Sequence, residues 1–223
     1  MDERRQCRVR NIFAGPENAS SPVVRSPGQR AARYSSGWVQ MRKVLENRPA
    51  LRVLDFGPTS PGNINYLTGL GHSVYMANLV EEAAQPEWRI QRDGDTEPAS
   101  FDVDRFIAEQ MDFSGRTFDI VFFWDTADYL PAALTARVFE RIHEVMSTEG
   151  VLLAFFHART TGPDTAFQRY HLTDSDSVEM QPSTEHAIEQ VFQNRAIEKL
   201  FGAFNGFRFF LAKDNLREVL VYR

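Results

Sequence analysis

The amino-acid sequence predicts an α/β fold in which a three-layer, doubly wound, mostly parallel sheet is closed by an antiparallel C-terminal β-hairpin. Two observations support this prediction. Short apolar runs alternate with amphipathic helical patterns along most of the chain, and the last two apolar runs flank a polar turn. Alternating strands and helices produce parallel strands with right-handed crossovers, whereas two runs joined by a short turn form a hairpin.

The first third of the chain begins this alternation. Apolar residues recur at helical spacing over 37–48, and Pro49 ends that helix. The run 51–56 is short and almost wholly apolar, as expected for a strand buried on both faces. A short helix and a second strand, ending near Asn78, follow. The polar stretch 81–100 has no steady period, so we expect a long irregular connection with one helical turn at its start.

The middle of the chain repeats the pattern more clearly. A helix is predicted over 101–110, and the aromatic and β-branched run 118–124 is the most strand-like in the sequence. Pro131 opens an amphipathic helix that Gly150 is expected to stop, and 151–157 is the next buried strand.

The last third changes character. Two short strands are predicted around the polar turn 174–176, followed by a helix over 185–204. The final hairpin turns at 213–215, between two apolar runs. The two mirrored halves of a dinucleotide dehydrogenase would not end in this way.

Length and composition favour one domain with an N-terminal arm. The chain has 223 residues, of which 43 % are apolar, enough for one sizeable core. Residues 1–36 carry seven arginines against three acids and few apolar side chains, so we expect a basic, disordered arm before a domain spanning 37–223. The alternative is a lid that folds over a ligand or contacts an acidic partner.

Charge and cysteine content narrow the class of protein. The net charge of −5 argues against nucleic-acid binding that rests on phosphate neutralisation. The single cysteine, Cys7, excludes an internal disulfide framework and fits a reducing compartment. No apolar run approaches the roughly 20 residues of a membrane span. We therefore expect a cytoplasmic protein with no membrane partner.

The stretch "VLDFGPTSPGN", residues 53–63, places polar groups where an apolar strand ends. Asp55 would lie at the carboxyl edge of the sheet, where open α/β folds bind ligands. Pro58 and Pro61 have no backbone N–H, and the Thr59 side chain stands where a pyrophosphate would need close approach. The loop therefore disfavours NAD and FAD.

From 37 to 223 the chain resembles a class I S-adenosylmethionine-dependent methyltransferase. The blocks that carry the resemblance are the closing hairpin and the motifs "VLDFG", "GHSVYMANL", "FDIVFFWDTADYLP" and "VMSTEGVLLAFFH". The resemblance implies S-adenosylmethionine as the cofactor. It also implies that the first loop cradles the methionine part, that the second strand ends at the ribose, and that the segment around the fourth strand lines the adenine and the substrate.

Carried onto this sequence, the resemblance implies a cofactor site at the ends of the strands. Thr59 departs from the family's second loop glycine, Pro61 from the third, and Asn78 from its ribose-binding acid. An amide in place of a carboxylate costs about 1 kcal/mol, which weakens binding without forbidding it. The implied cofactor-binding residues are Asp55, Gly57, Pro58, Thr59, Ser60, Asn78, Asp112 and Trp124.

The implied methyl acceptor, expected to be a small molecule, would lie near Asp125 and His157 as catalytic residues. His157 ends a predicted strand and could act as a general base, or be a hydrogen-bonded histidine at a strand end. Asp112 could cap a loop instead, and Asp128 is expected to cap the helix at Pro131. No histidine has a second ligand at metal spacing, so no metal site is predicted.

Two functions follow from the sequence. The first is methyl transfer from S-adenosylmethionine to an unidentified acceptor. The alternative is a catalytically inactive, methyltransferase-like binding or interaction module, which the altered glycine loop and Asn78 suggest.

Overall fold

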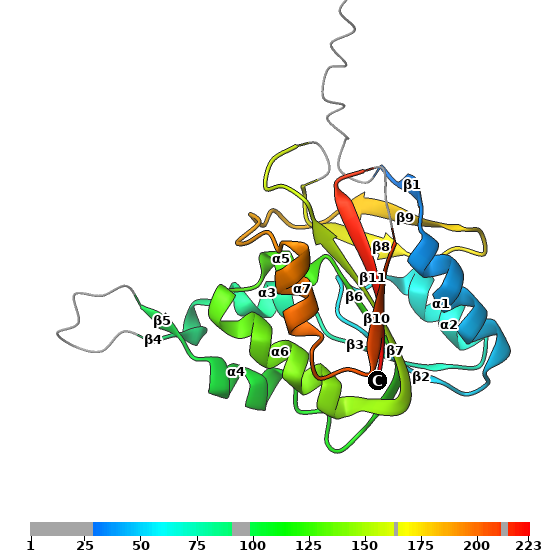
Figure 1. Ribbon diagram of the computed structural model, residues 1–223, viewed down its shortest axis with the longest axis horizontal. Coiled ribbons are helices and arrows are strands. Elements are labelled where there is room, and N and C mark those ends of the chain that lie inside the picture. The colour runs from blue at the N-terminus through cyan, green and yellow to red at the C-terminus, as the bar shows by residue number, and fades with distance from the viewer. Residues whose placement is uncertain (1–28, 91–98, 163–164, 211–213) are drawn as a thin grey trace, which may run out of the picture.

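A computed structural model describes residues 29–90, 99–162, 165–210 and 214–223. Its centre is a six-stranded sheet in the order β10-β11-β7-β6-β2-β3 (Figure 1). The four strands from β7 to β3 are parallel, and β11 and β10 run antiparallel at the other end. The strands are β2 Arg52–Asp55, β3 Ser73–Met76, β6 Phe118–Trp124, β7 Met146–His157, β10 Gly206–Phe210 and β11 Leu216–Tyr222.

This topology confirms the predicted α/β class, the mostly parallel sheet and the C-terminal hairpin. The hairpin does not close the sheet, however, since β10 and β3 remain as its two edges. The expectation of a closed sheet was therefore wrong. A hairpin adds two strands at one end and leaves the other end open.

Helices cover both faces of the sheet and give the three predicted layers (Figure 1). Alternate residues of β6 point to opposite faces, so Ile120 and Phe122 join one core cluster whereas Val121 and Phe123 join the other. On the first face lie α1 Ser36–Asn47 and α2 Pro61–Gly69. On the second lie α3 Leu79–Ala83, α4 Val103–Gln110, α5 Thr126–Tyr129, α6 Ala132–Val145 and α7 Asn194–Leu200.

Serine side chains cap the two helices of the first face. The Ser35 hydroxyl accepts a hydrogen bond from the Trp38 N–H at the start of α1. Ser60 does the same for the Asn63 N–H at the start of α2, where Pro61 occupies the first turn. Both arrangements satisfy backbone donors that a helix leaves free at its N-terminus.

A second, three-stranded sheet lies above the carboxyl ends of the parallel strands (Figure 1). It consists of β1 Ala31–Tyr34, β9 Ser177–Pro182 and β8 Gln168–His171, in that order and all antiparallel. The pair β8 and β9 was predicted. The ordered strand β1 was not, so the expectation of disorder is wrong for residues 31–34, and the part of the arm over 1–28 lies outside the described residues.

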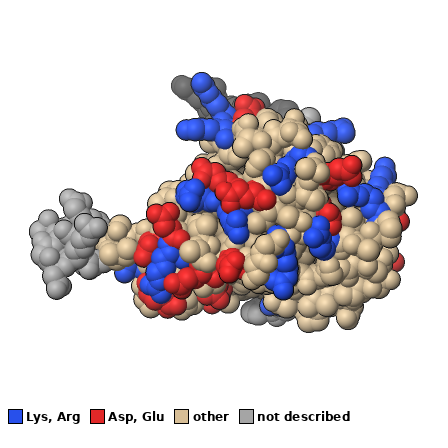
Figure 2. Space-filling view, turned by 90° about the horizontal axis from the view of Figure 1, so that it is seen from below, with Lys and Arg blue, Asp and Glu red and all other residues tan. Residues whose placement is uncertain are grey.

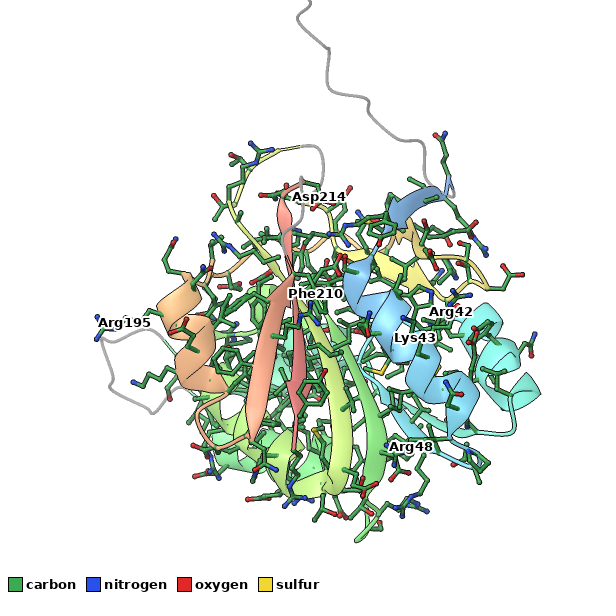
Figure 3. All side chains as sticks on the ribbon, turned by 45° about the vertical axis from the view of Figure 1, so that its right-hand side comes forward. Arg42, Lys43, Arg48, Arg195, Phe210 and Asp214 are labelled. Atoms are coloured by element: carbon green, nitrogen blue, oxygen red, sulfur yellow. The ribbon has the colours of Figure 1, made fainter. Side chains whose placement is uncertain are left out.

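A buried ion pair fastens β1 to the C-terminal hairpin. The Arg33 guanidinium donates from Nη1 to Glu218 Oε1 at 2.5 Å and from Nε to Asp214 Oδ2 at 2.6 Å. The other Glu218 oxygen accepts hydrogen bonds from Ser35 Oγ and the Gly37 N–H. Asp214 lies at the upper end of the hairpin in Figure 3. These bonds explain why this end of the arm is ordered.

Two element boundaries differ from the sequence prediction. Gly150 does not separate helix from strand, because β7 already begins at Met146 and bulges between the pairs Phe118↔Met146 and Ile120↔Val151. The helix expected over 185–204 forms only as α7. Ahead of α7, the N–H groups of Glu189 and Gln190 donate to the Asp128 carbonyl. This part of the backbone is therefore bonded to α5 and not to its own preceding turn.

The predicted irregular connection contains several short elements. These are α3, the 3-10 turn Pro86–Trp88, and the two-residue strands β4 Arg89–Ile90 and β5 Ser100–Phe101, which pair with each other. Residues 91–98 lie outside the described part. Within the described residues, no helix is both long and apolar enough to cross a membrane. Positive and negative side chains are interspersed on the face seen in Figure 2.

Candidate functional site

The candidate site lies where the carboxyl ends of β2 and β6 meet, and this place, which side chains of the chain fill, is called the crevice below. These strands are neighbours in the sheet, although the chain passes through β3 and α4 between them. Chain connections diverge at such a switch point, and open α/β folds bind their ligands there. Asp55 is the last residue of β2, and Trp124 is the last residue of β6. The sequence prediction that both lie at this edge is confirmed.

The Asp55 carboxylate is buried, and both of its oxygens accept hydrogen bonds from the chain. It is 1 % exposed. Its Oδ1 accepts hydrogen bonds from Trp124 Nε1 at 2.7 Å and the Gly57 N–H at 3.2 Å, and its Oδ2 accepts one from Asn63 Nδ2 at 3.2 Å. Burial raises the pKa of Asp55 to about 6, although these three bonds act in the opposite direction.

The Trp124 indole lies directly over Gly57, in the loop that follows β2. Its backbone has φ of 46°, a left-handed conformation that is unusual for a large side chain. The ring is stacked between Phe122 and Tyr170, at centroid distances of 5.0 and 4.7 Å. A Cβ atom added to Gly57 would lie only 3.0 Å from Trp124 Cδ1. Glycine at position 57 therefore allows the indole, in place of a ligand, to approach the backbone closely.

Strand β8 covers the crevice from above through hydrogen bonds to α2 and its N-cap. Asn63 donates from Nδ2 to the Tyr170 carbonyl at 3.0 Å and accepts from the Leu172 N–H at 2.8 Å. The Ser60 hydroxyl, besides capping α2, lies 2.8 Å from His171 Nδ1. The small sheet is thus bonded to the loop that the sequence assigned to a cofactor.

The remaining predicted cofactor residues make the following contacts within the chain. The Asn78 side chain caps α3 by accepting from the Glu81 N–H. Asp112 is exposed, and its carboxylate accepts from the Ser114 N–H, which is the loop-capping alternative. Pro58 is buried and Thr59 is exposed.

In the arrangement that the structure has, contacts within the chain occupy positions that the sequence assigned to S-adenosylmethionine. The Asp55 carboxylate already accepts three hydrogen bonds from N–H groups of the chain, two at Oδ1 and one at Oδ2. The Trp124 ring covers Gly57, and Ser60 is bonded to α2 and β8. A cofactor would have to displace the ring and the strand above it.

A second cluster of buried polar groups lies behind Trp124, where β6 and β7 end side by side. Asp128 Oδ2 accepts from the His157 backbone N–H at 2.6 Å and lies 2.8 Å from His157 Nδ1. Asp125 Oδ2 accepts from the Tyr170 hydroxyl at 3.1 Å, and its Oδ1 has no hydrogen-bond partner. Burial raises the pKa of Asp125 to about 7 and also raises that of Asp128.

The structure brings together the predicted catalytic residues Asp125 and His157 and adds residues that sequence analysis did not assign. Asp128 does not cap the helix at Pro131; it lies in α5 and holds His157. Asn63 and Tyr170 join β8 to the crevice. The spacing of Asp125 and Asp128 after a strand could have suggested a shared site, whereas Asn63 and Tyr170 carry no such signal. In the described part of the chain, no group of three His, Cys, Asp or Glu residues could hold a metal ion.

No protein-family model and no curated protein matches the chain. Solved structures with a similar fold exist at low identity. One is the 1,6-didemethyltoxoflavin-N1-methyltransferase of Burkholderia thailandensis, with bound S-adenosylhomocysteine (12 % identity, 83 % of this chain and 76 % of that chain, TM-score 0.41).

Two further examples have similar scores. Magnesium protoporphyrin IX methyltransferase from Synechocystis shares 14 % identity over 83 % of this chain and 74 % of that one, with a TM-score of 0.43. A methyltransferase from Methanosarcina mazei shares 13 % identity over 80 % and 94 %, with a TM-score of 0.46.

Proposed function

We propose that this chain is a methyltransferase-like domain that binds a partner and does not transfer a methyl group. The observation that carries the proposal is the position of the Trp124 indole, which covers Gly57 and donates its N–H to Asp55. Without these contacts, the Asp55 carboxylate at the end of β2 would be available to the ammonium of an amino-acid moiety. Here neutral N–H groups of the chain satisfy it.

The surroundings of Trp124 support a filled crevice as a stable feature of the fold. The indole is 1 % exposed and is stacked on both faces. Asn63 then holds β8 in place over it by donating to the Tyr170 carbonyl and accepting from the Leu172 N–H. Opening the crevice would expose two aromatic rings and leave the buried Asp55 carboxylate with fewer donors, and each of these changes is unfavourable.

Methyl transfer to a small molecule is the second candidate, and the pair formed by Asp128 and His157 favours it. A carboxylate that orients a histidine at the ligand edge of the sheet is an arrangement suited to a general base. The resemblance of the sequence motifs points to the same activity. This candidate requires that the small sheet lift and that Trp124 leave Gly57.

Thermal denaturation with S-adenosylmethionine and with S-adenosylhomocysteine, each at millimolar concentration, separates the two functions. A ligand present at 100 times its Kd would stabilise the fold by about 2.7 kcal/mol, which is several degrees in Tm for a chain of this size. The proposed function predicts no such shift. A shift of several degrees would contradict it and support methyl transfer, and Asp55→Ala should then reduce the shift if the cofactor lies at the crevice.

A further inference from the structure

We propose that the free edge of β3 binds an extended, acidic peptide segment of a partner protein. This surface lies at the edge of the sheet and not in the crevice, so the inference goes beyond the proposed function and does not depend on whether the crevice admits a cofactor. The surface combines an unpaired strand edge with a basic groove beside it.

The unpaired edge follows from the register of β3. The N–H groups of Ser73 and Ala77 donate to β2, to the carbonyls of Leu51 and Asp55, at 2.9 Å in both cases. Backbone direction alternates along a strand, so Val74 and Met76 turn their N–H and C=O groups to the other side. No described strand pairs with β3 on that side.

This edge has few of the features that usually protect an edge strand. Natural sheets guard such edges with very short strands, lysine, proline, bulges or a covering helix or loop, and of these β3 has the short length, four residues. The sequence of β3 is Ser-Val-Tyr-Met, with no charged residue, no proline and no bulge in its pairing with β2. Tyr75 remains 39 % exposed. Edges of this kind accept an added strand, which gives affinity through backbone hydrogen bonds and specificity through alternate side chains.

A groove of about 260 Å³ begins at this edge strand and crosses the amino ends of β3, β2 and β6. Its walls include the side chains of Arg52, Ser73, Tyr75, Arg116 and Phe118. The rings of Tyr75 and Phe118 are 6.0 Å apart and form an apolar floor. The volume is below the range of about 300–1,000 Å³ typical of sites for drug-sized ligands, and it suits one or two side chains of a peptide better.

The charge of the groove selects an acidic occupant. Arg116 forms no ion pair with any described carboxylate, and its guanidinium donates only to the Phe113 carbonyl. Arg52 has Asp119 beside it, with Nε 3.5 Å from Oδ2. The groove thus has two guanidinium groups, and Asp119 forms an ion pair with that of Arg52 only. A carboxylate entering beside Arg116 would form a charge-assisted hydrogen bond that the chain itself does not supply.

The geometry of a strand explains how one peptide meets both features. A peptide that pairs with Val74 and Met76 directs every second side chain to the face that carries Ser73 and Tyr75. Glutamate or aspartate at those positions enters the basic groove. The intervening side chains point to the opposite face, where apolar residues are preferred because Val74 packs against the core there.

The experiment uses a blocked peptide, acetyl-Thr-Val-Glu-Val-Glu-Val-Thr-amide, with the full-length chain. We expect saturable binding by isothermal titration calorimetry and slower amide hydrogen exchange at Val74 and Met76, but no change at Tyr75, whose N–H already faces β2. Replacing both glutamates of the peptide by lysine should abolish binding. The variant Arg116→Glu should weaken binding about tenfold through charge reversal at one contact.

The matched control is Arg195→Glu, which makes the same charge change on an exposed arginine of α7, on the side of the molecule away from α1 (Figure 3). It should bind the peptide as the unmodified chain does. Unchanged exchange at Val74 and Met76 with millimolar peptide would overturn the proposal. So would equal competition by free glutarate, since that result identifies a small-anion site and not a strand site. S-adenosylmethionine titration reports separately on the crevice.

Discussion

The Trp124 indole and the Asp55 carboxylate are joined by a 2.7 Å hydrogen bond across the carboxyl ends of β6 and β2. The bond connects two neighbouring strands at the place where a ligand would separate them. It satisfies a buried acid with a neutral donor and holds an aromatic ring against Gly57. The same two residues that make the sequence resemble a cofactor-binding protein therefore close the crevice from within.

Replacing the indole N–H tests how much this bond stabilises the fold. Trp124→Phe keeps an aromatic ring between Phe122 and Tyr170 but removes a donor from buried Asp55, so we expect a loss of about 1–3 kcal/mol in the free energy of unfolding at pH 8. The loss should be smaller at pH 5, because the pKa of Asp55 is raised to about 6 and the carboxyl is then neutral in the folded state. Urea denaturation at both pH values measures it.

The control is Trp38→Phe, which removes an indole bond to a neutral acceptor, the Ser175 carbonyl. Trp38→Phe should lower the free energy of unfolding by about 0.5–1.5 kcal/mol, and by the same amount at pH 5 and at pH 8. The same pH dependence in both variants would show that ionisation of Asp55 is not involved.

Asp125 should make stability depend on pH in a defined direction. Burial raises its folded-state pKa to about 7, above its ordinary value of 3.8. Between these values the folded state binds the extra proton, so its contribution to stability is full below about pH 4 and is lost as the pH rises through 7. Asp125→Asn should remove up to about 1.4 kcal/mol per pH unit of this slope. Denaturant titrations from pH 4 to 8 measure the slope, and a slope that Asp125→Asn leaves unchanged would contradict this role of Asp125.

The buried ion pair of Arg33 should stabilise the fold far more than an exposed one. Arg33→Met leaves Glu218, which is 2 % exposed, without its cation, and we expect a loss of about 3–5 kcal/mol. Arg30→Met breaks an exposed pair with Glu179 on the same arm and should cost less than about 1 kcal/mol. Equal losses in chemical denaturation would mean that Arg33 contributes no more than a surface charge.

Two glycines should respond oppositely to alanine. A Cβ at Gly37 would overlap Leu153 Cδ1 and lie 3.1 Å from Glu218 Oε2, so Gly37→Ala should destabilise the fold by about 1–3 kcal/mol. Gly69 is in the last turn of α2 with nothing within 4 Å of an added Cβ, so Gly69→Ala should be neutral or stabilising by up to about 1 kcal/mol. Thermal denaturation ranks the two variants, and a reversed order would contradict the packing at Gly37.

The main sheet could be predicted from the sequence because its signals are local. The aromatic run that becomes β6 is buried on both faces, and its apolar character specifies a central strand without knowledge of its neighbours. The amphipathic pattern of α1 is similarly complete within one segment. Element types followed from these patterns, and so did the edge to which Asp55, Asp125 and His157 belong.

The small sheet and the closed crevice could not be predicted because their contacts join distant segments. Ala31 of β1 pairs with Met180 of β9, and neither segment has a sequence pattern that identifies the strand it pairs with. The bond from Asn63 to the Tyr170 carbonyl spans 107 residues. Sequence analysis therefore located the polar groups at the strand ends, but it could not show that the chain itself would occupy the space between them.

The ion pair between Arg33 and Glu218 couples the unfolding of the small sheet to that of the C-terminal hairpin. One partner sits on the strand that completes the small sheet, and the other sits on the last strand of the main sheet. Detaching the C-terminal hairpin would leave Arg33 without Glu218, and β1 would then be held mainly by its pairing with β9, which in turn pairs with β8. The stability of the small sheet over the crevice therefore depends on a hairpin at the opposite end of the chain. Hydrogen-exchange protection of Tyr170 should disappear together with that of Val219.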